Sequence, residues 1–218
     1  MNFNSPLFLL FITVVVTFNY FLSQRYRPSL LLFSGFLFIA YFNLESLFVV
    51  LTLAVFNFFV GLKISGNRFL YLISLFLNIA AMLLYNYFHV HQSNILFKNE
   101  DVGNSIILLG LLFYSLQNIA YITEVYYKRM QPEKSVLKYT LYISFFPKII
   151  SGPVMLPGEF ISQIGNNKPS KEMLVGGFNR FLFGLVKKMV IADRLAPAVH
   201  SIFDFSDNYS GITTWGGV

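Results

Sequence analysis

Five apolar stretches follow one another from near the N-terminus, and they limit the folds that this chain can adopt. They run from about 6 to 22, 29 to 42, 46 to 62, 69 to 88 and 105 to 123. A helix of about 20 mostly apolar residues is long enough to cross a hydrocarbon core of about 30 Å. The sequence therefore predicts an all-α, polytopic integral membrane protein with about five transmembrane helices.

The composition agrees with this class. Of the 218 residues, 56% are hydrophobic and only 12% are charged, about half the charged fraction of a soluble domain. So few charges exclude a disordered chain and disfavour a soluble globule. The chain has no Cys, which excludes disulfides and Cys-ligated metals. The net charge of +6 is small for a nucleic-acid binder. We therefore expect membrane lipids, and no nucleic acid, as partners.

Basic residues between the stretches predict the orientation. If all five stretches span, the loops alternate between the two sides of the membrane. The loops on one side hold eight basic residues, namely Arg25, Arg27, Lys63, Arg68, Lys128, Arg129, Lys134 and Lys138, whereas those on the other hold only Lys98. The positive-inside rule places the eight in the cytoplasm and the N-terminus outside.

The pattern changes after residue 138. The apolar run 139–150 is interrupted by Pro147, and Gly152, Pro153, Pro157 and Gly158 follow closely. Such a density of helix breakers excludes a continuous helix. We interpret 139–170 as a broken re-entrant or interfacial segment, which follows transmembrane helices in 1–138 and precedes amphipathic helices in 171–218, all within one domain.

Amide side chains lie inside three of the apolar stretches. Gln117 and Asn118 lie in the fifth, Asn57 in the third and Asn78 in the fourth. An amide surrounded by lipid needs a hydrogen-bond partner. Two interpretations stay open, which are hydrogen bonds between packed helices and the lining of a polar tunnel.

A basic stripe follows in 171–195. Arg180, Lys187 and Arg194 recur every seven residues, which places them within about 40° on an α-helical wheel. With the adjacent Lys188 they favour an amphipathic helix that contacts either the phosphates of a donor substrate or anionic lipid headgroups. A short helix over 192–205, entered through Pro197, and the start of a further helix at the end of the chain are predicted next.

The histidines do not predict a metal site. His89 and His91 follow the fourth stretch in a predicted outer loop, and only Glu100 and Asp101 lie near them in sequence. We interpret this loop as a solvated, interfacial one, and we assign His200 a structural role.

Two segments carry a resemblance to a known family. Residues 142–164 read YISFFPKIISGPVMLPGEFISQI, and residues 184–199 read GLVKKMVIADRLAPAV. Together they resemble the membrane-bound O-acyltransferase family, most closely the bacterial branch that acts on alginate and lipoteichoic acid. The resemblance covers essentially the whole chain. It implies tilted helices around a central tunnel in the bacterial inner membrane, with horizontal cytoplasmic helices.

The resemblance also implies a reaction. An acyl group, expected here to be acetyl, would pass from a cytoplasmic acyl-CoA or acyl-carrier thioester to an extracytoplasmic polysaccharide or cell-envelope acceptor, with an extracytoplasmic partner protein. The family's catalytic His lies in a Trp-His-Gly motif, which this chain does not contain. We therefore expect no catalytic residue here, and we expect the chain to be the N-terminal half of an acyltransferase. The candidates for the tunnel wall are Phe145, Phe146, Pro147, Gly152, Pro153, Gln117 and Asn118.

A non-catalytic membrane protein is the alternative. A transporter half would use 146–158 as its binding element, and an accessory subunit would need no site. An inverted repeat would favour a transporter, but the broken segment has no counterpart earlier in the chain.

Overall fold

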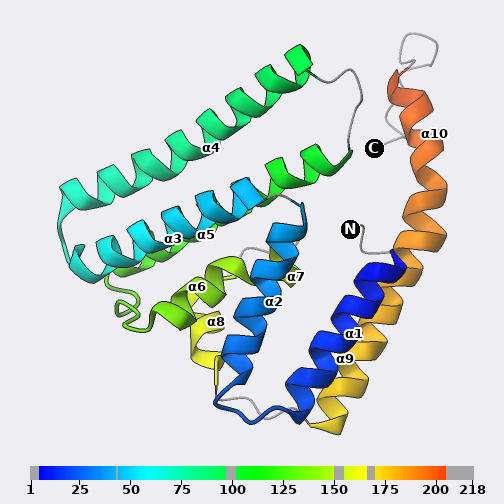
Figure 1. Cartoon of the computed structure of the whole chain (residues 1–218), viewed down its shortest axis with the longest axis horizontal. Coiled ribbons are helices and arrows are strands. Elements are labelled where there is room, and N and C mark those ends of the chain that lie inside the picture. Colours follow the sequence, from blue (N-terminus) through cyan, green and yellow to red (C-terminus); the bar gives the residue numbers. More distant parts are fainter. Residues whose placement is uncertain (1–4, 43, 97–101, 150–154, 166–169, 205–218) are drawn as a thin grey trace. The chain divides into compact units, whose positions relative to one another are not determined.

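The computed structural model describes residues 5–42, 44–96, 102–149, 155–165 and 170–204 (Figure 1). The helices are α1 (Pro6–Phe21), α2 (Arg27–Phe42), α3 (Leu44–Lys63), α4 (Arg68–Leu96), α5 (Val102–Tyr126), α6 (Val136–Ser144), α7 (Phe146–Ile149), α8 (Pro157–Gln163), α9 (Lys171–Val186), the π-helix η1 (Lys187–Ala192) and α10 (Asp193–Asp204). No strand occurs in these ranges, so the all-α prediction is confirmed for them.

The first five helices follow the five apolar stretches. Among the residues searched, α3 is the one helix long and apolar enough to cross a membrane, and Pro6–Phe21, Arg27–Phe42 and Arg68–Leu84 are shorter apolar helices. The prediction of about five transmembrane spans therefore stays a prediction. The broken segment is confirmed in its outline, because α6 ends before Phe145, whose backbone is extended, and α7 is a single short turn.

Local hydrogen bonds explain where several helices begin. Ser5 precedes Pro6, and its Oγ accepts a hydrogen bond from the Phe8 N–H at 3.2 Å. Ser170 does the same for α9, where its Oγ accepts from the Met173 N–H at 3.1 Å. Both are N-caps that satisfy a backbone donor left free by the first turn.

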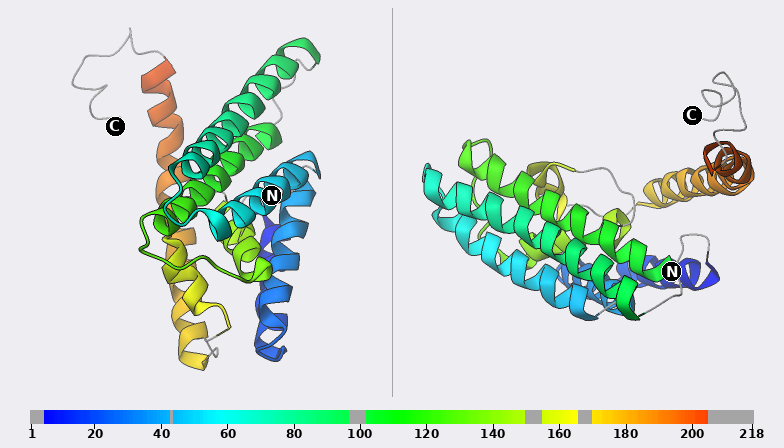
Figure 2. Two further views of the ribbon diagram at one scale, coloured as in Figure 1. Left: turned by 90° about the vertical axis from the view of Figure 1, so that its left-hand side faces the viewer. Right: turned by 90° about the horizontal axis from the view of Figure 1, so that it is seen from above.

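The chain forms two compact units, which divide near residue 167. In the first unit, α5 packs against α3 and α4, and α2 packs against α3 (Figures 1 and 2). The short helices fit among the long ones, since α6 contacts α2, α3, α5 and α8, and α7 contacts α2 and α5. The core of this unit therefore surrounds the segment that the sequence marks as broken. The second unit consists of α9, η1 and α10, which follow one another in sequence.

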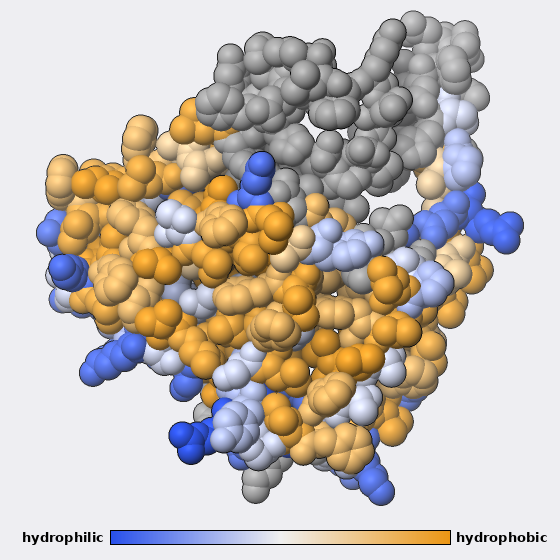
Figure 3. Space-filling view, viewed as in Figure 1, coloured by the Kyte–Doolittle hydropathy of each residue, from blue (hydrophilic) through white to orange (hydrophobic). Residues whose placement is uncertain are grey.

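The surface of the first unit is strongly apolar. Hydrophobic side chains cover most of the face of α3 and α4 that Figure 3 shows, and hydrophilic ones gather at the end where α3 turns into α4. Phe48, Phe69 and Phe76 are each about 70% exposed. A large apolar surface of this kind is rare on soluble proteins and suits contact with lipid.

Two local expectations are wrong. Helix α4 continues to Leu96, so the backbone at His89 and His91 is helical rather than part of a loop. Pro197 lies inside α10 and does not start a helix. In the first case the apolar pattern ends before the backbone hydrogen bonds do, because polar residues such as Gln and Asn also form helices.

Candidate functional site

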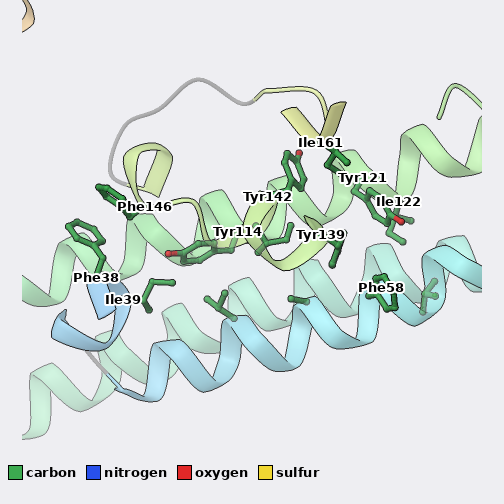
Figure 4. Packing of buried hydrophobic residues seen from close by; sticks show 14 of the residues in the cluster. Phe38, Ile39, Phe58, Tyr114, Tyr121, Ile122, Tyr139, Tyr142, Phe146 and Ile161 are labelled. Carbon is green, nitrogen blue, oxygen red and sulfur yellow. The ribbon is translucent and has the colours of Figure 1, made fainter. Parts of the chain in front are cut away.

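The broken segment lies in the centre of the first unit. Tyr139 and Tyr142 of α6 are fully buried, in a helix that contacts α2, α3, α5 and α8 (Figure 4). The Tyr139 ring packs against Tyr121 with 4.6 Å between centroids and against Phe58 of α3 at 5.7 Å. Helix α6 is thus held by aromatic rings rather than exposed on a surface.

The two phenylalanines of the Phe-Phe-Pro motif pack against different helices. Phe146 is buried against Phe11 of α1 and Phe38 of α2, with ring centroids 5.2 and 5.5 Å away. Phe145 turns the other way and packs against Phe160 of α8 at 5.1 Å. Pro147 lies in α7 and is partly buried. Gly152 and Pro153 lie outside the described residues, and the tunnel-lining role of the whole set stays a prediction.

Helix α2 approaches α6 very closely at one glycine. A Cβ added to Gly35 would lie 2.2 Å from the backbone oxygen of Ser144. Only a residue without a side chain fits there, so Gly35 sets the distance between the two helices. The sequence does not reveal this role of Gly35, because a single Gly inside an apolar stretch carries no signal of a contact more than 100 positions away.

Gln117 and Asn118 join α5 to α6. The Asn118 Oδ1 accepts from the Tyr139 hydroxyl at 2.5 Å, and its Nδ2 donates to the Tyr114 carbonyl at 3.0 Å. The Gln117 amide, oriented to satisfy its hydrogen bonds, donates to the carbonyls of Ile143 (3.0 Å) and Tyr142 (3.2 Å). Those carbonyls belong to the last turn of α6, where the helix itself offers no N–H donors to them. These bonds fit the interhelical interpretation.

The second amide pair forms a closed group between α3 and α4. Asn57 Oδ1 accepts from Asn78 Nδ2 at 2.9 Å and from Ser74 Oγ at 2.7 Å, and Asn57 Nδ2 donates to Asn78 Oδ1 at 3.2 Å. All three side chains are fully buried. Every polar group has a partner, so this cluster holds two helices together and offers nothing to a ligand.

Lys148 is the unexpected residue of the site. It is 5% exposed, and its Nζ lies 3.5 Å from the ring centroid of Phe160, 4.9 Å from that of Tyr142 and 5.7 Å from that of Phe145. Such a cage attracts a cation through the negative faces of the rings. Burial acts against the charged form and lowers the pKa of Lys148 to about 8.

Several donors of this region lack partners among the described residues. They are the Nζ of Lys148 on α7 and the hydroxyls of Tyr114 and Ser115 on α5. The two helices pack against each other, and Figure 4 shows the Tyr114 hydroxyl directed toward the side of Phe146. Buried donors without acceptors are costly, and groups of this kind suit an oxygen acceptor such as a carbonyl or a carboxylate. In the sequence, the feature that could have indicated this buried amine is a single Lys within an aromatic segment rich in helix breakers.

The basic residues of the second unit do not lie on one line. Arg180 lies on α9, Lys187 and Lys188 in the π-helix, and Arg194 on α10. A π-turn holds an extra residue, which rotates the following positions by about 100° relative to a continuous α-helix. The shared face expected for Arg180, Lys187 and Arg194 is therefore interrupted before Arg194.

The same π-turn explains an ion pair. Lys188 Nζ lies 3.3 Å from Asp193 Oδ1, a pair separated by five residues, which the i→i+5 geometry brings to one side. The Lys188 charge is thus partly compensated. Contact of these four basic residues with donor phosphates or lipid headgroups stays a prediction.

The described part of the chain contains no group of three His, Asp or Glu side chains able to hold a metal ion. The polar groups of the described site are the Lys148 ammonium, tyrosine and serine hydroxyls, and amides.

Comparison with known proteins supports the resemblance drawn from the two motifs. The chain is 28% identical to a "probable alginate O-acetylase" of Azotobacter vinelandii and 27% identical to one of Pseudomonas aeruginosa, over 97% of its length in both cases. It is 29% identical to a peptidoglycan O-acetyltransferase of Helicobacter pylori over 98% of its length. The predicted resemblance to bacterial O-acyltransferases is thereby confirmed.

The match covers only part of each relative. The aligned region accounts for 45%, 44% and 48% of the three proteins, respectively. The chain thus spans about half the length of the curated relatives it matches. No family model matches the chain, and no solved structure matches it either.

Proposed function

We propose that this chain is part of a bacterial inner-membrane enzyme that transfers an acetyl group to a hydroxyl of an extracytoplasmic polysaccharide. The similarity along nearly the whole chain to proteins named for alginate and for peptidoglycan acetylation carries this proposal. These two names differ in the acceptor polymer and agree in the transferred group. We therefore propose O-acetyl transfer as the reaction without choosing between the two acceptor polymers.

The structure of the first unit supports a multi-pass arrangement in the membrane. Helices α4 and α5 have 29 and 25 residues, which corresponds to about 44 and 38 Å at 1.5 Å per residue, longer than a hydrocarbon core of about 30 Å. Exposed apolar side chains on α3 and α4 suit lipid contact. With the N-terminus outside, the basic residues at the α3–α4 turn and after α5 lie in the cytoplasm.

The proposed reaction divides the chemistry between two kinds of group. A hydroxyl oxygen, either of the polymer or of a partner protein that passes the acetyl group on to it, attacks the thioester carbonyl carbon. The carbonyl oxygen takes up the negative charge, and the carbon–sulfur bond breaks when the tetrahedral intermediate collapses. The proton of the hydroxyl ends on the thiol. A general base and donors to the oxyanion lower this barrier. The base belongs to the Trp-His-Gly motif that the resemblance implies, and donors such as Lys148 suit the oxyanion.

The donor would be an acyl-CoA or an acyl-carrier thioester, and an extracytoplasmic partner protein would complete delivery to the polymer. Neither is bound permanently, so the protein needs no resident cofactor in this proposal. Gln117 and Asn118 would act only indirectly, because they hold α6 and hence the Phe-Phe-Pro motif in place.

Genetic deletion tests the proposal. A strain without the gene should lose ester-linked acetate from its cell-envelope polysaccharide, measured as acetate released by mild alkali, and the restored gene should return it. An unchanged acetate content in the deletion strain would contradict the proposal. Substrate-dependent flux through the purified protein in vesicles, without acetyl transfer, would favour the transporter alternative.

A further inference from the structure

The ends of three helices meet at the predicted cytoplasmic side of the first unit. Tyr71, in the first turn of α4, stacks on Tyr126, the last residue of α5, with 4.2 Å between ring centroids and 10° between ring planes. The α3–α4 connection is short, because α3 ends at Lys63 and α4 begins at Arg68. The ends of α3, α4 and α5 therefore form one surface.

Tyr127 extends this aromatic pair into solvent. Its ring is 58% exposed and meets Tyr126 and Tyr71 edge-on, with centroid distances of 5.1 and 6.3 Å. The Arg129 guanidinium lies over the Tyr127 ring, 5.6 Å from its centroid, and is paired with Glu124 at 3.3 Å. An exposed ring thus has a defined orientation, set by its neighbours on two sides.

The backbone under Tyr127 is tightly closed. Lys128 has a positive φ of 57°, and the N–H groups of Arg129 and Met130 both donate to the Glu124 carbonyl, at 3.0 and 3.3 Å. This pattern ends a helix by satisfying its last carbonyls.

The loop that follows is anchored to the core. The N–H of Glu133 donates to the hydroxyl of the buried Tyr121 at 3.1 Å. The loop that carries Tyr127 and Arg129 is therefore held at both ends, and a ligand would meet a preformed surface.

This surface carries an excess of positive charge. Exposed basic residues lie at these helix ends and in the loops that join them, and they are Lys63, Arg68, Lys128, Arg129 and Lys134. The acidic residues of the same segments are Glu124, which pairs with Arg129, and Glu133, whose carboxylate accepts from the Ser135 N–H at 2.8 Å. Five basic side chains against these two carboxylates leave a net positive charge on this surface.

We propose that this surface binds a nucleotide phosphate ester, with a planar base stacked on Tyr127 and its phosphates on the surrounding Lys and Arg side chains. An exposed aromatic face together with an arginine is the combination on which nucleobases stack, and lysine and arginine are the usual phosphate ligands. Anionic lipid headgroups share the phosphate chemistry but need no ring face. If the proposed acetyl transfer holds, the ligand is the nucleotide part of the acyl-CoA donor.

Binding of coenzyme A tests the proposal directly. The protein as the cell makes it, in nanodiscs of phosphatidylcholine, should bind coenzyme A in a calorimetric titration. Tyr127→Ala should weaken this binding about tenfold, because a stacked base contributes roughly 1–3 kcal/mol and 1.4 kcal/mol corresponds to tenfold. Tyr127→Phe keeps the ring and should bind as the unmodified protein does.

Tyr41→Ala is the matched control. Tyr41 is 57% exposed near the end of α2, which the charge count places on the opposite side of the membrane, so its loss should leave the binding unchanged. A second arm titrates short-chain phosphatidylglycerol into the detergent-solubilised protein. Binding of this lipid without binding of coenzyme A, or equal affinity of Tyr127→Ala and the unmodified protein for coenzyme A, would overturn the proposal.

Acetyl transfer, measured in parallel, separates this inference from the proposed function. If coenzyme A binding depends on Tyr127 but the protein has no transfer activity, the nucleotide-binding surface is supported and the proposed enzymatic function is contradicted. Acetyl transfer that Tyr127→Ala leaves unchanged at a limiting donor concentration would support the proposed enzyme and contradict a role of this surface in donor binding.

Discussion

Two sets of buried polar side chains in the first unit differ in how completely their hydrogen bonds are satisfied. Between α3 and α4, the side chains of Asn57, Ser74 and Asn78 bond to one another. By contrast, the Nζ of Lys148 on α7 and the hydroxyls of Tyr114 and Ser115 on α5 have no hydrogen-bond partner among the described residues. A buried polar side chain by itself therefore does not indicate function. A closed set of hydrogen bonds stabilises helix packing, whereas unmet donors leave room for a ligand.

The largest stability effect should come from the closed cluster. Asn57→Leu removes the acceptor of two hydrogen bonds and leaves Asn78 and Ser74 buried with fewer partners, at a cost of about 2 kcal/mol. Unfolding of the detergent-solubilised protein, followed by circular dichroism in increasing denaturant, measures this loss. The double variant Asn57→Leu/Asn78→Leu should lose less than the sum of the two single variants, and strict additivity would contradict the closed cluster.

The α5–α6 bonds should give a somewhat smaller effect. Gln117→Leu leaves the carbonyls of Tyr142 and Ile143 without a donor at the end of α6 and should cost about 1 kcal/mol. Gln117→Glu tests the direction of the bonds, because an ionised carboxylate cannot donate to these carbonyls, and it should be at least as damaging. If both variants unfold at the same denaturant concentration as the unmodified protein, Gln117 does not hold α6.

Lys148→Met should have a small effect of the opposite sign at neutral pH. The folded pKa of Lys148 is about 8, below its ordinary 10.5, so the charged amine disfavours the folded state below pH 8. This cost disappears as pH rises from about 8 to 10.5, because above 10.5 the amine is neutral in the unfolded state as well. Unfolding should show that the unmodified protein gains stability across this range relative to Lys148→Met.

A matched substitution makes the pH test specific. Lys63→Met removes an exposed lysine at the end of α3 and controls for the loss of one positive charge. Equal pH dependence in the Lys148→Met variant and the unmodified protein would show that the caged amine is not the group responsible. Loss of acetyl transfer by a stably folded Lys148→Met protein would favour a role for this amine in the reaction.

Local sequence patterns predicted the helices well. The apolar stretches coincide with α1 to α3 to within a few residues, and Pro147 marks the break between α6 and α7. These features depend on residues close together in the chain. Hydropathy did not predict that α4 extends past its apolar part to Leu96, and a fixed period of 3.6 residues did not predict the π-helix between α9 and α10. Backbone hydrogen bonds determine both of these features.

The candidate site depended on distant residues. The sequence indicates that Gln117 and Asn118 are buried amides that need hydrogen-bond partners. It does not indicate which carbonyls and which hydroxyl those partners are. Lys148 was visible as a charge in an apolar segment, yet its cage includes Phe160 from α8, twelve positions further on. Tyr71 and Tyr126 are more than 50 positions apart and stack only because α4 and α5 pack side by side.

The sequence by itself determined the all-α class, the approximate positions of the helices, the break after α6 and the resemblance to acetyltransferases. Each follows from composition, from short-range pattern or from a linear motif. Only the tertiary structure decided that Gly35 lets α2 approach α6, that Asn57 and Asn78 satisfy each other, and that Lys148 lies within aromatic rings. The physical reason is that burial and hydrogen-bond satisfaction are properties of side chains brought together from different helices, and no single segment contains both partners.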